Sequence, residues 1–121
     1  MTATAAPAPV VPARRRGERY PPIESHGVIG DLQTVALIGL DGRISFLCLP
    51  EFDSATVFAS LLDADRGGCF EITPHLAHPR HRQMYLPDTN VLLTRVLADE
   101  GVCEISDFMP IPNKPGPSRI I

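Results

Sequence analysis

Residues 34–49 read TVALIGLDGRISFLCL, and this stretch decides the fold class. Two apolar runs, residues 34–40 and 43–49, lie on either side of Asp41 and Gly42. Asp-Gly between two such runs is a strong hairpin signal, because a type I′ turn requires positive φ at both central residues. The stretch therefore predicts two antiparallel β-strands joined by a tight turn.

Alternation along the second of these strands predicts which of its faces is buried. Successive side chains of a strand point to opposite faces of the sheet. Ile44, Phe46 and Cys48 therefore share one face, and the residues between them share the other. The face with Ile44, Phe46 and Cys48 is the more apolar one, so it is predicted to face the core.

Residues 54–63, SATVFASLLD, have a different periodicity. Apolar residues recur at spacings of one, three and four, which is typical of one face of a helix; they are Val57, Phe58, Leu61 and Leu62. Asp53 or Ser54 would cap the start of this helix, and glycine at 67 and 68 would end it. The segment predicts one short helix.

Four further segments read as strands, namely residues 69–73, 83–86, 90–98 and 102–108. Turns rich in Gly and Asp separate several of them at short intervals, which is typical of antiparallel sheets. No pattern of alternating strands and helices indicates a parallel sheet. The sequence therefore predicts a mainly β fold, an antiparallel β-sandwich with one short helix.

The two ends of the chain differ in composition from this middle part. Many of the 13 prolines lie in the first 22 residues or the last dozen. Residues 1–19 are predicted to be a disordered arm rich in Ala, Pro and Arg, and residues 20–110 to be the β-sandwich domain. Residues 111–121 are predicted to be a Pro-rich loop and the start of a truncated strand, so the chain is expected to continue beyond Ile121.

Charge and composition exclude several classes of partner. The first 20 residues hold four arginines and one glutamate, which gives them a net charge of +3. Because the whole chain has a net charge of −3, the remaining residues have a net charge of −6. An acidic body without a basic face does not predict nucleic-acid binding. The sequence has no signal-peptide pattern and no apolar stretch of membrane-spanning length, and it has no phosphate-binding Gly motif. No cofactor, nucleic acid or membrane partner is predicted.

Cys48, Cys69 and Cys103 have spacings that match no metal or redox motif. Three free thiols indicate a reducing compartment, and the protein is predicted to be cytoplasmic. His75, His78 and His81 recur every third residue, but Pro74 and Pro79 interrupt a helix there. These histidines are read as solvated loop residues, and no metal site is predicted.

Several short motifs resemble a known family. They include His26-Gly27 with Ile29-Gly30-Asp31, Leu47-Cys48-Leu49-Pro50 with Phe52-Asp53-Ser54, Leu61-Leu62-Asp63, Tyr85-Leu86-Pro87-Asp88-Thr89-Asn90 and Asp107-Phe108-Met109-Pro110. In this order they resemble the trehalase-like N-terminal domain of bacterial glycoside hydrolase family 15 proteins, over residues 20–110. The sequence departs from the family pattern in having Phe46 where a Trp is usual and Glu51 where a basic residue is usual.

The resemblance implies a β-sandwich that packs against a catalytic (α/α)6 barrel of the same polypeptide, encoded after Ile121. Two glutamates of that barrel would carry out inverting hydrolysis of an α-glucosidic bond, as in trehalose or malto-oligosaccharides. The parent is therefore expected to be a glycoside hydrolase of the inverting α-glucosidase or trehalase type. The present chain alone is expected to be inactive.

Four residues are predicted to lie near substrate, although no catalytic residue is assigned. His26 lies between flexible glycine-containing segments and belongs to the family pattern, and its alternative role is a hydrogen bond to a buried backbone group or to Asp31. Phe46 and Phe52 could stack on a sugar, or belong to the core. Asp53 belongs to the loop expected to reach the active-site rim. The acidic clusters, such as Glu51 with Asp53, lie at turns where carboxylates commonly cap backbone groups.

Three functions can be compared on these observations. The first is a non-catalytic docking domain that supports the barrel. Such a domain alone is expected to self-associate through an exposed sheet face. The alternative is a stand-alone carbohydrate-binding module, which the absence of Trp and an aromatic content of 6% disfavour. A complete small enzyme lacks a convincing catalytic constellation in this sequence. The docking domain is the prediction.

Overall fold

The computed structural model describes residues 19–111, so the predictions for residues 1–18 and 112–121 lie outside the described residues. The chain forms a short 3₁₀ helix and seven strands, which are η1 (Ile23–Ser25), β1 (His26–Gly30), β2 (Val35–Gly39), β3 (Ile44–Cys48), β4 (Thr56–Phe58), β5 (Arg80–Tyr85), β6 (Leu92–Ala98) and β7 (Gly101–Asp107). All strand pairs are antiparallel, in one sheet of order β1-β2-β3-β4 and one of order β5-β6-β7. The mainly β antiparallel fold is confirmed.

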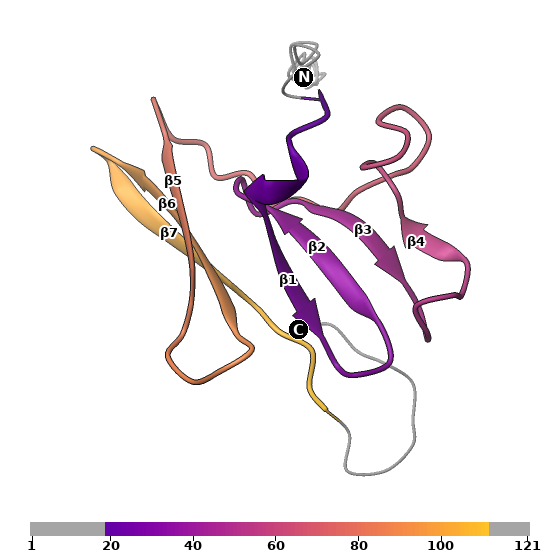
Figure 1. The fold of residues 1–121 in the computed structure, drawn as a ribbon. Helices are drawn as coiled ribbons and strands as arrows, with labels where there is room; N and C mark the ends of the chain where they lie inside the picture. Colours follow the sequence, from indigo (N-terminus) through magenta and orange to yellow (C-terminus); the bar gives the residue numbers. More distant parts are fainter. Residues whose placement is uncertain (1–18, 112–121) are drawn as a thin grey trace, which may run out of the picture.

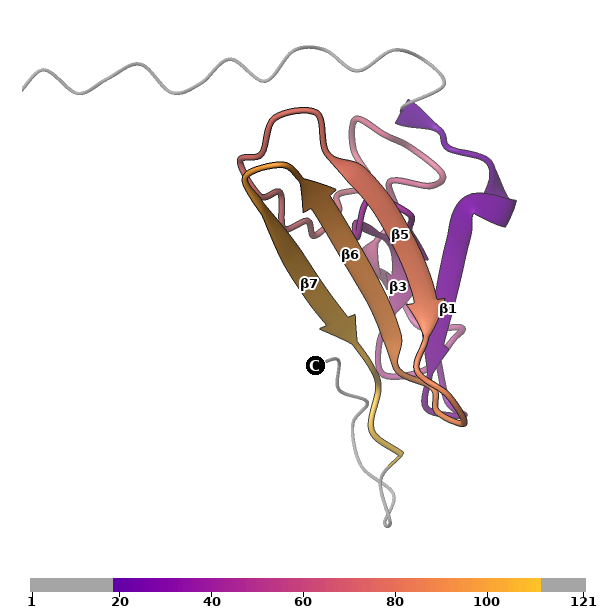
Figure 2. The ribbon, with the colours of Figure 1, turned by 90° about the vertical axis from the view of Figure 1, so that its left-hand side faces the viewer.

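The two sheets form two layers. Figure 1 shows the β5–β7 sheet beside the β1–β4 sheet, and in the turned view of Figure 2 the β5–β7 sheet lies in front of β1 and β3. The layers approach closely at Gly27 of β1, where an added Cβ would lie 2.6 Å from Leu92 Cδ2. A side chain at position 27 would therefore push the sheets apart. No helix within residues 19–111 is long and apolar enough to cross a membrane.

The hairpin predicted from Asp41-Gly42 is present, but with a different turn. The Gly39 N–H donates to the Arg43 carbonyl at 2.8 Å, and the Gly42 N–H donates to the Gly39 carbonyl at 2.8 Å. Gly42 has a φ of 82°, whereas Asp41 is not among the residues with positive φ. Three loop residues with a left-handed glycine last are the common alternative to the two-residue type I′ turn.

A β-bulge changes the core face predicted for β3. Ala36 pairs with Leu47 and Ile38 with Ile44, so the register shifts by one residue between them. A bulge places two residues opposite one and reverses the alternation beyond it. Ile44 and Leu47 therefore both belong to the core, while Phe46 is only half-buried. The prediction of Ile44 as a core residue is confirmed, and the prediction that Phe46 shares its face in the core is wrong.

The core lies between the sheets and comes mainly from the β1–β4 sheet. Its members are Ile29, Ala36, Ile38, Ile44, Leu47, Leu92 and Met109, with Leu49 and Phe58 packed against them. Ala36, Ile38, Ile44 and Leu47 lie in the two apolar runs that the sequence predicts as strands, and the antiparallel pairing brings these strands together. Met109 shows that the chain still contributes to the core after β7 ends.

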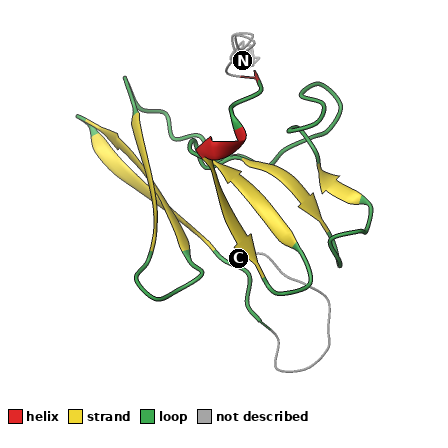
Figure 3. Cartoon of the chain, in the orientation of Figure 1, coloured by secondary structure: helices red, strands yellow, loops and turns green. Residues whose placement is uncertain are grey.

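The helix predicted over residues 54–63 is absent. Residues 56–58 form β4, which pairs with the free edge of β3 through Leu47 with Phe58 and Cys48 with Thr56, and turns follow. Figure 3 shows this region as a strand followed by a loop. Val57 is 47% and Leu62 70% exposed, so the predicted helical face is not buried. Pairing with an open sheet edge outweighs a weak local helical preference.

The strand predicted at residues 69–73 is reduced to one bridge, between Ile44 and Phe70. The three other predicted strands correspond to β5, β6 and β7. β5 begins at Arg80, three residues before the predicted start at Gln83. Its first residues lie in the polar segment that sequence analysis read as loop, because edge strands tolerate charged side chains on their outer face.

Candidate functional site

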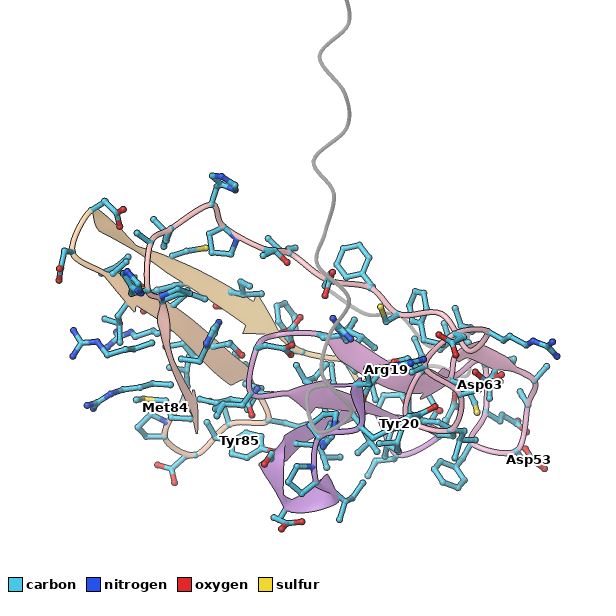
Figure 4. The ribbon with its side chains drawn as sticks, turned by 90° about the horizontal axis from the view of Figure 1, so that it is seen from above. Arg19, Tyr20, Asp53, Asp63, Met84 and Tyr85 are labelled. Carbon is cyan, nitrogen blue, oxygen red and sulfur yellow. The ribbon has the colours of Figure 1, made fainter. Side chains whose placement is uncertain are left out.

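One end of the sandwich combines three of the four residues predicted to lie near substrate. Phe46 lies on β3 and Phe52 in the following loop, with ring centroids 6.5 Å apart and planes tilted by 57°. Phe52 is 58% exposed. Phe52 and Asp53 line an open hollow of about 340 Å³ together with Leu32, Gln33 and Glu51. Figure 4 shows Asp53 at the outer edge of the molecule, on the opposite side from Met84 and Tyr85.

The turn over residues 31–34 forms one wall of this hollow and is held by a buried carboxylate. Asp31 Oδ1 accepts hydrogen bonds from the Gln33 and Thr34 N–H groups, both at 3.0 Å. Thr34 Oγ1 in turn donates to the Cys48 carbonyl at 2.6 Å. Within this turn Leu32 has a φ of 74° and is 91% exposed. The turn therefore presents an apolar side chain to solvent from a left-handed backbone.

Two neighbouring loops are hydrogen-bonded to the region of this turn. The Phe52 N–H donates to the Gln33 carbonyl at 3.0 Å, which fixes the β3–β4 loop against the turn. On the other side, Asn90 Nδ2 donates to the Gly30 carbonyl at 2.7 Å. We call the turn 31–34 with the loops 49–55 and 86–91 the loop end of the sandwich. Residues 49–55 include a cis peptide bond between Leu49 and Pro50.

Side chains of β5 close the free edge of β1. The Tyr85 hydroxyl donates to the Val28 carbonyl and accepts from the Val28 N–H, both at 2.8 Å. Gln83 Nε2 donates to the Gly39 carbonyl at 3.0 Å. An uncovered strand edge presents unpaired backbone groups that invite pairing with another chain. The Tyr85 contacts satisfy both backbone groups of Val28 at this edge, and together with the Gln83 bond to Gly39 of β2 they join the two sheets.

His26 lies at the opposite end of β1, about 13 Å of strand from Gly30. Its Nδ1 is 3.1 Å from the Pro22 carbonyl, and since a carbonyl only accepts, Nδ1 carries the proton. Nε2 is buried and has no partner among residues 19–111. A cavity of about 20 Å³ adjoins the ring, which is room for roughly one water. The backbone partner Pro22 is exposed, whereas the structural role considered for His26 was a hydrogen bond to a buried backbone group or to Asp31. The proximity of His26 to substrate stays a prediction.

A larger pocket of about 430 Å³ opens between the sheets near His26. We call it the mouth pocket; its polar lining includes Ser25, Asp41, Glu71, Thr73 and His81, among proline and aliphatic side chains. Glu71 Oε2 accepts from Arg43 Nε at 2.9 Å and from an Arg43 terminal nitrogen at 2.6 Å. The volume is within the range of small-molecule sites. The site residues Phe46, Phe52 and Asp53 do not line this pocket.

Asp107 is the last residue of β7, and the pKa of its carboxyl is shifted. Burial raises the pKa of Asp107 above 3.8, because a low-dielectric environment disfavours the charged form. Its Oδ2 is buried with no hydrogen-bond partner within the described part of the chain. Asp107 lines neither the hollow nor the mouth pocket.

The geometry of the hollow fits binding better than hydrolysis. Inverting hydrolysis requires one carboxylic acid and one carboxylate roughly 6.5 to 9.5 Å apart, in a pocket that holds sugar and water. Glu51 and Asp53 are both exposed at an open surface. No cluster of three or more His, Cys, Asp or Glu between residues 19 and 111 could hold a metal ion. The hollow is therefore an open surface that carries two exposed carboxylates.

Comparison with known proteins identifies the family. The sequence profile described as "Trehalase-like, N-terminal" matches residues 13–121. The chain belongs to this family. No solved structure is significantly similar to this trehalase-like N-terminal domain.

Similar proteins of known name are trehalases. The domain is 39% identical over 95 residues to a trehalase of Thermoplasma volcanium, covering 77% of this chain and 15% of that protein. It is 43% identical over 88 residues to trehalase 1 of Sulfolobus acidocaldarius, covering 73% and 15%. For a trehalase of Mycolicibacterium smegmatis the identity is 33% over 109 residues, covering 90% and 16%. The chain thus spans about one sixth of the length of these relatives.

Sequence reasoning missed several residues that shape this trehalase-like N-terminal domain. Tyr85 and Asn90 were noted only as letters of a family motif, although both bond to backbone groups of distant residues. Leu32 was not singled out, because no local signal marks a leucine for a left-handed backbone. The one clue that the sequence offered was the family motif Ile29-Gly30-Asp31, because Asp31 begins the turn that contains Leu32.

Proposed function

We propose that this chain is the non-catalytic N-terminal β-sandwich domain of a glycoside hydrolase family 15-like enzyme. The parent would hydrolyse α-glucosidic bonds, as in trehalose or malto-oligosaccharides, with a catalytic (α/α)6 barrel that this domain packs against and supports. The match to the trehalase-like N-terminal family, combined with coverage of 15% to 16% of the three trehalases above, carries the proposal.

The structure supports a supporting role rather than a catalytic one in two ways. The hollow at the loop end has exposed carboxylates and no enclosed space between them. In addition, many large apolar side chains are exposed within residues 19–111, Leu32, Phe52 and Ile111 among them. Exposed apolar groups of this kind mark surfaces that are covered in an assembly.

The test compares three proteins on trehalose, maltose and dextrin. They are the 121-residue chain, a chimera in which it replaces the matching segment of the Mycolicibacterium smegmatis trehalase, and the remainder of that trehalase alone. We expect no turnover by the chain, and trehalose hydrolysis by the chimera with a longer half-life on heating than the remainder shows. Turnover by the chain, or an equally stable remainder, would reject the proposal.

A stand-alone carbohydrate-binding module is the second candidate, favoured by the exposed Phe52 ring beside Asp53. An aromatic ring next to hydrogen-bond acceptors is a common way to hold a sugar. Calorimetric titration of the 121-residue chain with trehalose and maltoheptaose distinguishes the two. Saturable binding that Phe52→Ala abolishes would favour the module.

We also propose a cytoplasmic location and self-association of the isolated chain. Cys48, Cys69 and Cys103 are all free thiols, which suits a reducing compartment. Self-association would cover exposed apolar side chains that the catalytic domain covers in the parent. Sedimentation velocity over a concentration series tests the second point, and a monomer at all concentrations would contradict it.

A further inference from the structure

Four exposed apolar side chains lie on the loop end and on the segment that follows β7. Leu32 is 91%, Ile111 60%, Phe52 58% and Leu86 38% exposed. Single exposed apolar residues are common on protein surfaces, whereas grouped ones mark a contact surface. These four come from the turn 31–34, the loops 49–55 and 86–91, and the segment after β7.

Leu32 has an unfavourable backbone as well as an exposed side chain. A left-handed conformation is strained for residues with a Cβ, and Asn or Asp tolerate it better than Leu. The Asp31 carboxylate nevertheless holds this turn through the Gln33 and Thr34 N–H groups. Neither the left-handed backbone nor the exposed side chain of Leu32 stabilises the isolated domain. Both are explained if Leu32 contacts a surface outside residues 19–111.

The loop end is also held in place before any partner arrives. The Phe52 N–H bonds to the Gln33 carbonyl, and Asn90 bonds to the Gly30 carbonyl. The Phe52 ring packs at 6.5 Å from the Phe46 ring. A surface that is already ordered loses less conformational entropy on binding than a flexible one. The loop end is therefore preorganised for contact.

The path of the chain indicates what covers this surface. Figures 1 and 2 both show the segment after β7 running past the turn between β1 and β2, at the same end of the two sheets. In the similar trehalases, most of the polypeptide lies outside the part that this chain matches. Polypeptide that continues from Ile111 therefore starts its path beside the loop end.

We propose that the loop end is the surface on which the catalytic part of the same polypeptide docks, with Leu32 and Phe52 as its apolar anchors. Exposed Glu51 and Asp53 line the hollow beside these anchors, so the facing surface would be apolar at its centre and neutral or basic at its rim. This inference rests on the proposed function and adds the position of the interface.

The test uses the chimera with the Mycolicibacterium smegmatis trehalase and the variants Leu32→Asn and Phe52→Ala. The matched control is Leu62→Asn, which changes a 70% exposed leucine in the loop after β4. Anchor residues of interfaces commonly contribute 1.4 kcal/mol or more, so we expect Leu32→Asn to shorten the half-life of trehalose hydrolysis on heating about tenfold. Phe52→Ala should act in the same direction, and Leu62→Asn should leave the half-life unchanged.

The isolated 121-residue chain gives a readout of opposite sign. Since Asn tolerates a left-handed backbone better than Leu, Leu32→Asn should leave the melting temperature of the chain unchanged or raise it. A lower melting temperature would place Leu32 in the domain's own packing and overturn the inference. Equal half-lives for the Leu32→Asn and Leu62→Asn chimeras would also overturn it. Failure of the unsubstituted chimera to outlast the trehalase remainder would instead reject the proposed function.

Discussion

The two sheets of this domain are stabilised in different ways. The β1–β4 sheet supplies Ile29, Ala36, Ile38, Ile44 and Leu47 to the main core cluster, whereas the strands of the β5–β7 sheet supply Leu92 to it and also bury Leu93 and Val96. The outer face of the β5–β7 sheet carries the exposed residues Arg80, Arg82, Arg95 and Glu104. Burial of apolar side chains contributes more to the β1–β4 sheet, while the β5–β7 sheet depends in addition on cross-strand pairs and on side-chain bonds to its neighbour. Substitutions in the first should therefore cost more stability than substitutions in the second.

The largest loss is expected from Ile38→Ala in the β1–β4 sheet. Ile38 is fully buried, and truncation of a buried Ile leaves a cavity that costs about 2–5 kcal/mol. Urea denaturation of the 121-residue chain measures the free energy of unfolding. Val102→Ala on the β5–β7 sheet, at a residue 61% exposed, should cost less than about 0.5 kcal/mol. Equal losses of unfolding free energy from Ile38→Ala and Val102→Ala would contradict the expected difference between the sheets.

A smaller loss is expected from Tyr85→Phe, which removes two hydrogen bonds between the sheets but keeps the ring. The hydroxyl makes two hydrogen bonds with Val28, and each contributes about 0.5–1.5 kcal/mol. The control is Tyr20→Phe, whose hydroxyl accepts one bond from the Ala64 N–H at 3.1 Å. In thermal unfolding, the melting temperature of Tyr85→Phe should be lower than that of Tyr20→Phe. The reverse order would mean that the closed edge of β1 contributes little.

Asp107→Asn should change how stability depends on pH. A raised pKa means that the fold favours the protonated carboxyl, so this contribution is fully present below pH 3.8 and is lost as pH rises through the raised pKa. Asparagine stays neutral, so the variant should be more stable than the original protein at pH 7, and this gain should be smaller at pH 3. Urea titrations at both pH values, with exposed Asp99→Asn as the control, measure this. If the difference in unfolding free energy between the variant and the original protein is the same at both pH values, Asp107 ionises as freely as a surface carboxyl.

The smallest effect is expected from Glu104→Gln on the outer face of the β5–β7 sheet. Glu104 pairs across the ladder with Arg95, which in turn lies opposite Arg82. Removing the carboxylate leaves two opposed arginines, but exposed ion pairs contribute only about 0.2–1 kcal/mol. The loss should shrink in 0.5 M salt because the charges are screened. A loss that is insensitive to salt would point to packing instead.

Predictability differed between segments for physical reasons. The hairpin around Asp41 and Gly42 was predictable because a turn and its two strands are specified by adjacent residues. The segment 54–63 was not, because its apolar spacing fits a helix and the open edge of β3 decides in favour of a strand. Phe46 and Phe52 were both considered as aromatic residues that could stack on a sugar, but their contact with each other and the separation of His26 from both depend on the tertiary structure.

By itself, the sequence determined that this protein is an antiparallel β-sandwich and that it belongs with trehalase-like N-terminal domains, because alternation, turn residues and motif order are local properties of the chain. The tertiary structure alone decided the bulge in β3, the bonds of Tyr85 and Asn90 to β1, and the exposure of Leu32 on a left-handed turn. These features depend on which distant segments become neighbours, and that is settled only when both sheets bury their apolar faces together.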